Sequence, residues 1–377
     1  MLIEKPARIT SIDLLRGIIM VIMALDHSRF FLHTDEMTHN PLDLSYTTST
    51  LFFTRWITHY CAPNFIFLAG IAAFLYGQKQ GANLTRFLIT RGLWLIFLEL
   101  TLFKYLWMGH LFTNLFPLLV IWAIGISMIF LALWRKLPFG LMLATGLMMI
   151  ALHNLTDSYN PDSNTPIGAL WTFLHKPQGT SVGNLHFYVL YSVIPYFGLI
   201  SVGYCFGRLY LPGVDPEKRH RTLILSGVAC IALFVVLRLT NVYGDPKPWV
   251  SYNWLWSNWA NYRFTFMSFL NTEKYPCSLL YILMTVGPAL IFLGVAENLK
   301  NSVASFFIAI GKVPMFYYIL HLIILRSIGL ALGGLNQYRL TTVYFAWIFV
   351  VCLLYFPCNW FAKYKAANPG KWWLSYL

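Results

Sequence analysis

Apolar stretches of about 20 residues, the length a helix needs to cross a bilayer, recur along the whole chain. Lipid offers no hydrogen bonds to the backbone, so such stretches should be helical. The pattern predicts ten apolar spans, near residues 11–32, 49–77, 92–109, 112–134, 138–154, 186–209, 221–240, 276–296, 304–331 and 341–362. We therefore expect an all-α integral membrane protein, with about ten transmembrane helices in one bundle forming a single domain over residues 1–377.

Basic residues lie in alternate connections between these spans, including the segments before the first span and after the tenth. Lys and Arg are in excess on the cytoplasmic side of membrane proteins, so we expect both termini in the cytoplasm. Two of the opposite connections are long, at residues 155–185 and 241–275. The second holds tryptophans at 249, 254, 256 and 259, which either stack on sugar rings or form an interfacial aromatic belt.

Composition supports the assignment to integral membrane proteins and limits the kinds of partner to be expected. The chain is 58% hydrophobic and 11% charged, against roughly 25% charged residues in soluble domains. Its net charge of +13 fits a basic cytoplasmic surface, so we expect the lipid bilayer and no nucleic acid as a partner. Six scattered cysteines form no CxxC pair, and no set of histidines and carboxylates has metal-ligand spacing, so no metal is predicted.

The first span carries several ionisable residues, which are costly in lipid and usually mark a site. Arg16 and His27 are eleven positions apart, which places them only about 20° apart around a helix and about 16 Å apart along it. Asp13 lies on the same side, and Met20 and Met23 fall between.

This stripe suits a long substrate, with Arg16 holding a polar part and His27 acting as a general base toward the outer end. The alternative is that His27 and Arg16 are satisfied by neighbouring helices while Asp13 caps the helix start. In that case the stripe is structural.

The second span contains a similar group. Arg55 and His59 are four positions apart and should share a face, while Pro63 breaks the helix ladder just before Asn64. This arrangement suits either the wall of a site or a simple packing kink. Asn64 is a candidate donor to an oxyanion.

Other ionisable residues have simpler interpretations. We expect Glu99 to pair with Arg16, Arg55 or a histidine. His321 has the setting of a satisfied core histidine. Three basic residues near span ends are expected to reach the membrane interface: Lys104, Arg238 and Arg326.

The segment "SIDLLRGIIMVIMALDH" (residues 11–27) resembles the opening of two related groups of membrane acyltransferases. In the acyltransferase-3 family an acid, an Arg and a His have the spacing of Asp13, Arg16 and His27. The heparan-alpha-glucosaminide N-acetyltransferase family has the "LRG" start, and "APNFIFLAG" (62–70), "KYPCSLLYILMTVGPAL" (274–290) and "GKVPMFYYILHL" (311–322) also look like its bacterial branch.

The resemblance implies transfer of an acetyl group from cytoplasmic acetyl-CoA, as co-substrate, to a sugar amine or hydroxyl on the outer side. It implies a multi-pass protein of the bacterial inner membrane, with a homodimer as a possible assembly. The substrate and acyl-CoA would contact Asp13, Arg16, Arg55, Asn64 and Lys274.

The catalytic histidine has three candidates. In the heparan enzyme an Asn matches His27, and the essential His lies in the following outer loop, where this chain has "HNPLDL" beginning at His39. His59 falls where that enzyme has an Asp, so it could be a partner. We favour His27, because helix geometry fixes its spacing from Arg16. A proton-coupled small-solute transporter is the alternative function, although the sequence shows no repeated halves.

Overall fold

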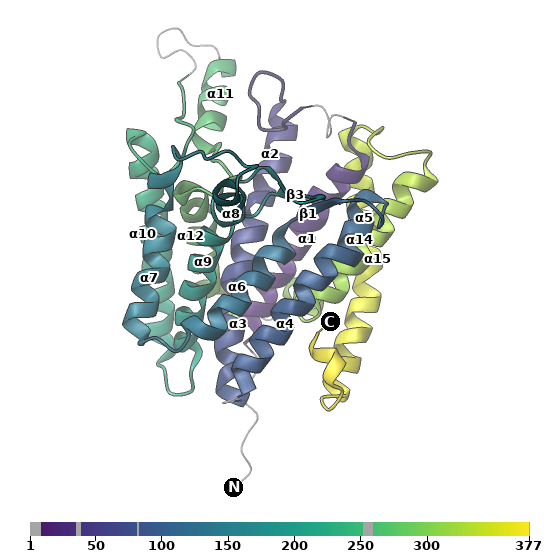
Figure 1. Ribbon diagram of the computed structural model, residues 1–377. Coiled ribbons are helices and arrows are strands. Elements are labelled where there is room, and N and C mark those ends of the chain that lie inside the picture. Colours follow the sequence, from purple (N-terminus) through teal and green to yellow (C-terminus); the bar gives the residue numbers. More distant parts are fainter. Residues whose placement is uncertain (1–8, 35–38, 81–82, 252–258, 300, 377) are drawn as a thin grey trace. The chain divides into compact units, whose positions relative to one another are not determined.

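The computed structural model describes residues 9–34, 39–80, 83–251, 259–299 and 301–376, and most of these are helical (Figure 1). The tryptophans at 254 and 256 lie outside the described residues. The chain divides into two compact units, which are described separately below. The first comprises residues 1–61, 249–271 and 289–377, and the second comprises residues 62–248 and 272–288.

The first unit is built around α1 (Thr10–Leu32), which packs on α13, α14 and α15. Its other helices are α2 (Ser49–Ile57), the 3₁₀ turn Thr58–Tyr60, α11 (Trp259–Leu270), the last part of α12 (Leu279–Val295), the 3₁₀ turn Ala296–Asn298, α13 (Ser302–Gly311), α14 (Pro314–Ala331), α15 (Leu340–Ala367) and the 3₁₀ turn Trp372–Ser375.

The close approach of α1 and α13 depends on two glycines. A Cβ atom added to Gly17 would overlap the carbonyl of Phe307, and one added to Gly311 would overlap the carbonyl of Asp13. Small residues at such crossings let backbones approach, and van der Waals packing then drives association in lipid. The glycine of the "LRG" segment is therefore a packing requirement.

The far end of α1 is tied to the connection between α14 and α15. The amides of Asn336 and Tyr338 donate to the carbonyls of Phe31 and Leu32, at 3.0 and 2.8 Å. The last carbonyls of a helix have no partner within it, and this connection supplies one. α1 and α14 are thus held together beside His27.

The predicted single span at 304–331 is wrong, because α13 ends at Gly311 and α14 begins at Pro314. Val313 between them is non-helical, with φ −133° and ψ 55°. Proline disfavours helical geometry in the residue before it and has no N–H to continue a helix. Pro314 is instead well placed at the first position of a new helix.

The second unit contains two close helix pairs: α4 packs on α6, and α7 packs on α9. Facing glycines allow both contacts, Gly92 with Gly125 and Gly146 with Gly198. Its helices are most of α3 (Cys61–Gln80), α4 (Leu84–Leu98), the π-helix Glu99–Phe103, α5 (Lys104–Met108), α6 (Val120–Trp134), α7 (Phe139–Leu152), the 3₁₀ turn His153–Thr156, α8 (Pro166–Leu174), α9 (Val193–Phe206), the 3₁₀ turn Gly207–Tyr210, α10 (Pro216–Thr240) and the first part of α12 (Leu279–Val295).

A small sheet in the second unit corrects two predicted spans. β1 (Leu115–Leu118) pairs in parallel with β3 (Leu185–Val189), and β2 (Gly179–Val182) pairs antiparallel with β3. The stretches 112–134 and 186–209 therefore begin as strands, and become helical only at α6 and α9. The two-residue turn "GN" at 183–184, with Gly183 at φ +60°, was a readable hairpin signal.

Within the described residues, six helices are long and apolar enough to cross a membrane. They are Ser49–Gln78, Phe139–Thr156, Pro216–Thr240, Leu279–Asn298, Pro314–Ala331 and Leu340–Ala367. The all-α membrane class is thus supported, whereas the predicted number of ten is not confirmed. α1 is not among the six, although it has 23 residues, and it carries Asp13, Arg16, Asp26 and Arg29.

Candidate functional site

His27, three-quarters of the way along α1, faces a second histidine on α14. Its Nδ1 lies 2.6 Å from Nε2 of His321, a residue 294 positions later in the chain. His321 is fully buried, whereas His27 is partly exposed. The pair therefore has one member sealed inside the protein, His321, and one member with part of its surface exposed, His27.

The geometry of the two rings shows that they meet edge to edge. Their planes are only 15° apart, and their centroids are 4.9 Å apart. That centroid distance is what a 2.6 Å contact between nitrogens gives when two five-membered rings lie end to end. A shared plane directs the lone pair of one nitrogen at the hydrogen of the other, as a strong hydrogen bond requires.

The neighbours of His321 fix its orientation. Its Nδ1 lies 2.9 Å from the carbonyl oxygen of Tyr317, one turn earlier on α14. The ring of Tyr318 meets both histidines edge-on, with centroids 5.9 Å from His27 and 5.4 Å from His321. Sequence reasoning treated His321 as a core histidine, because helix periodicity cannot show which residue on another helix it faces.

Next to His27, one carboxylate holds two arginines. Asp26 accepts hydrogen bonds from Arg29 at 3.0 Å and from Arg55 of α2 at 2.5 Å. Arg55 also donates to the hydroxyl of Thr58 at 3.2 Å. This cluster fastens α2 to the end of α1 that carries His27. The predicted binding residue Arg55 thus has a clear structural role.

At the other end of α1, Arg16 forms an ion pair with Asp13 at 3.2 Å and donates to the carbonyl of Gly311 at 3.3 Å. α1 begins at Thr10, its N-cap residue Ile9 makes no side-chain cap hydrogen bond, and Asp13 lies in its first turn. Met20 and Met23 are buried. Asp13 and Arg16 thus lie together as predicted, and the two methionines between Arg16 and His27 are packed inside the protein. The role of this stripe in binding substrate stays a prediction.

The two alternative histidines have different settings. His39 is exposed in the loop after α1, and its ring lies 4.8 Å from that of Tyr46. His59 is fully buried in the 3₁₀ turn Thr58–Tyr60. That turn tightens the chain ahead of Pro63, so the regular α-helical spacing expected to align Arg55 with His59 is interrupted.

Two predicted binding residues belong to the second unit. Asn64 is buried on α3 and donates to the carbonyl of Thr285 at 3.2 Å. Lys274 is buried as well, with its ammonium 5.8 and 5.2 Å from the ring centroids of Tyr191 and Tyr275. A desolvated ammonium over aromatic rings is a favourable setting for a cation. Their roles in binding substrate remain predictions.

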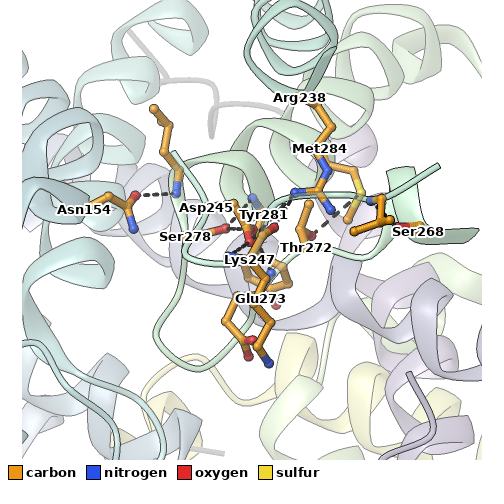
Figure 2. A network of polar contacts seen from close by, with 12 residues as sticks. Asn154, Arg238, Asp245, Lys247, Ser268, Thr272, Glu273, Ser278, Tyr281 and Met284 are labelled. Carbon is orange, nitrogen blue, oxygen red and sulfur yellow. Dashed lines mark hydrogen bonds and ion pairs between the residues drawn. The ribbon is translucent and has the colours of Figure 1, made fainter. Parts of the chain in front are cut away.

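Figure 2 shows the polar network around Asp245, which includes Glu273 and Ser278. Asp245 accepts hydrogen bonds from the amide of Glu273 and the hydroxyl of Ser278, both at 2.8 Å. Arg238, at the end of α10, lies 3.9 Å from Asp245 and donates to the carbonyl of Lys247 at 2.9 Å. The loop after α10 is thereby fixed to the segment that leads into α12.

Three expectations about charged residues are corrected. Arg238 and Lys104 are buried instead of reaching the interface, and Lys104 donates to the carbonyl of Thr113 at 2.6 Å. Glu99 accepts from the amide of Leu119 at 2.8 Å instead of pairing with an arginine or a histidine. Because burying an unsatisfied polar group is expensive, these side chains turn to nearby backbone groups.

Comparison with known families gives a match over residues 8–238 to the heparan-alpha-glucosaminide N-acetyltransferase catalytic family. The match covers more than half of the chain. The chain belongs to this family. No curated protein sequence matches it.

Membership of the N-acetyltransferase family makes the chain a membrane protein of the acetyltransferase type, as the resemblance implied. The matched region holds α1 to α10, and therefore His27, His39 and His59. His321 and Lys274 lie beyond it.

Proposed function

We propose that this family member transfers an acetyl group from cytoplasmic acetyl-CoA to an amine or hydroxyl of a sugar on the outer side of the cell membrane, with His27 as the base. The observation that carries the proposal is the position of His27, partly exposed and fixed from behind by the buried His321. A neutral imidazole held in one orientation is a suitable general base.

In the proposed reaction, the hydroxyl oxygen or amine nitrogen of the acceptor attacks the thioester carbonyl carbon. His27 removes the acceptor's proton during this attack. The new C–O or C–N bond forms, and the C–S bond then breaks. The proton that His27 carries passes to the departing thiolate, which restores the neutral ring and releases CoA. A covalent acetyl-histidine is the variant mechanism, in which His27 itself attacks the thioester.

The other end of α1 supports the orientation of the donor. Arg16 stands near the start of α1, the end expected to face the cytoplasm, and basic residues gather in the segments on that side. Phosphate groups of CoA are recognised by such cations through charge-assisted hydrogen bonds. Arg16 is already paired with Asp13, so its charge is partly neutralised and it would neutralise only part of the charge of a CoA phosphate.

The direct test uses purified protein in detergent, radiolabelled acetyl-CoA and glucosamine as a probe acceptor. We expect CoA to raise the thermal unfolding temperature and label to appear on glucosamine. His27→Ala should reduce transfer by about 10²–10⁴-fold, the usual contribution of a general base, while leaving CoA stabilisation intact. Single-turnover labelling without acceptor separates direct transfer from the acetyl-histidine variant.

His39→Ala is the matched control, because it removes the competing histidine from an exposed loop. We expect nearly full activity. Full activity of His27→Ala, with loss in His39→Ala, would contradict the assignment and move the base into the loop. Absence of both CoA binding and transfer in the unaltered protein would contradict the proposed function itself.

A further inference from the structure

We propose that His321 is a positioning residue that fixes the tautomer of His27, so that Nε2 of His27 is the nitrogen that takes the acceptor proton. This inference rests on the proposed function for its catalytic meaning. The tautomer itself follows from contacts within the first unit. His321 lies outside the region matched to the family, so its role comes from this structure.

The assignment begins at the carbonyl of Tyr317, which can only accept a hydrogen bond. Nδ1 of His321 lies 2.9 Å from that oxygen, so Nδ1 must carry a hydrogen. His321 is fully buried within the span Pro314–Ala331, where a positively charged ring is costly. His321 is therefore neutral, and its Nε2 has a lone pair and no hydrogen.

That lone pair determines the state of His27. Nε2 of His321 accepts, so Nδ1 of His27, at 2.6 Å, must donate to it. The nearly coplanar rings place the N–H on the line between the two nitrogens. A neutral His27 with its hydrogen on Nδ1 has its basic lone pair on Nε2.

This tautomer is not the one that a free histidine prefers, since the hydrogen of a neutral imidazole side chain in water favours Nε2. The hydrogen bond to His321 therefore changes the preferred tautomer of His27. It keeps the hydrogen on Nδ1 and leaves the basic lone pair on Nε2, the nitrogen farther from the helix backbone. When Nε2 takes the acceptor proton, the resulting imidazolium keeps its Nδ1–H bond to His321. The proton then leaves from Nε2 to the thiolate, and His321 stays neutral throughout.

The variant pair His321→Leu and His321→Gln separates this role from packing. Leu fills the volume but cannot accept a hydrogen bond, whereas the amide oxygen of Gln can occupy the place of Nε2. In both variants the Tyr317 carbonyl keeps its main-chain hydrogen bond within α14. We expect Leu to lower kcat by about 10–100-fold with little change in the KM for acetyl-CoA, as losses of supporting hydrogen bonds do at metal-bound histidines. Gln should restore most of the loss.

Two controls keep a folding defect apart from the proposed effect. Leu322→Ala removes a fully buried neighbour on α14 and should lower thermal stability while leaving kcat unchanged. In the double variant His27→Ala with His321→Leu, kcat should be no lower than in His27→Ala alone, because His321 acts only through His27. Equal loss in the Leu and Gln variants, or multiplying losses in the double variant, would overturn the proposal.

A readout independent of activity distinguishes this inference from the proposed function. Nitrogen-15 solid-state NMR of histidine-labelled protein in lipid, assigned by the spectrum of His27→Ala, reports which ring nitrogens carry hydrogen. We expect Nδ1–H at both His27 and His321, and a shift of the His27 hydrogen to Nε2 in His321→Leu. A hydrogen on Nε2 of His27 in the unaltered protein would overturn the inference, whether or not acetyl transfer is observed.

Discussion

Replacing Gly17 by Ala tests whether the crossing of α1 and α13 holds the first unit together. The added methyl group would overlap the Phe307 carbonyl, and an alanine has no rotamer that avoids it. The helices must separate, which costs about 3 kcal/mol at the upper end of overpacking effects. Alanine is favoured over glycine in a helix by about 1 kcal/mol, so we expect a net loss of about 2 kcal/mol.

Gly140→Ala is the matched control, because a Cβ atom at Gly140 on α7 meets nothing within 4 Å. Gly140 is the second residue of α7, where the propensity gain is smaller than in a helix interior, so the difference between the two variants reports mainly the overlap. Gly311→Ala, whose Cβ would overlap the Asp13 carbonyl from the other side, should resemble Gly17→Ala. The free energy of unfolding would be measured by equilibrium denaturation in mixed micelles.

The same variant should also affect activity. Separation of the helices pulls Arg16 away from the Gly311 carbonyl and shifts α1, which carries His27. Substitutions without structural consequence usually change the free energy of unfolding by no more than about 0.5 kcal/mol. If the values for Gly17→Ala and Gly140→Ala differ by no more than this, the close crossing does not hold the first unit together.

Three further changes test the charged clusters. Asp26→Asn weakens the bonds from Arg29 and Arg55, and we expect a loss of about 1.5–3 kcal/mol in the free energy of unfolding; an unchanged value would mean that the cluster is not structural. Arg238→Met removes the cation facing Asp245, whose pKa is raised by burial, and should cost about 3 kcal/mol at neutral pH. Because the folded pKa of this carboxyl lies above the unfolded one, the deficit should shrink as pH falls and the carboxyl is protonated; a deficit that grows in acid would contradict this. Burial raises the pKa of Asp157, but hydrogen bonds from His175 and Asn154 outweigh it, so the net pKa is lowered. Its stabilising contribution should be present above the unfolded pKa and lost as pH falls through the folded value, and an Asp157→Asn variant should lack that component of acid sensitivity.

Predictions from helix periodicity were most reliable for features that lie within a single helix. The first span was predicted at 11–32, and α1 runs from Thr10 to Leu32. The common side of Asp13 and Arg16 was also foreseen, and the two form an ion pair. Rotation per residue is fixed within a helix, so residues three positions apart lie close whatever surrounds them.

Hydropathy failed where an apolar run changed its structure part-way. The stretch 304–331 is mostly apolar, yet Pro314 divides it into α13 and α14. The stretches 112–134 and 186–209 begin as strands that pair with each other. Hydropathy measures transfer into lipid and is nearly the same for an apolar strand and an apolar helix, so it could not place these breaks.

The sequence alone determined the membrane class, the course of α1 and the identity of the polar residues on it. Only the tertiary structure decided the partners of those residues: His321 for His27, Arg55 for Asp26, and the carbonyl of Gly311 for Arg16. Helix faces in lipid are all apolar, so hydrophobicity does not select which helices pair. Close packing at Gly17 and a few buried hydrogen bonds make that selection, and they join residues nearly 300 positions apart.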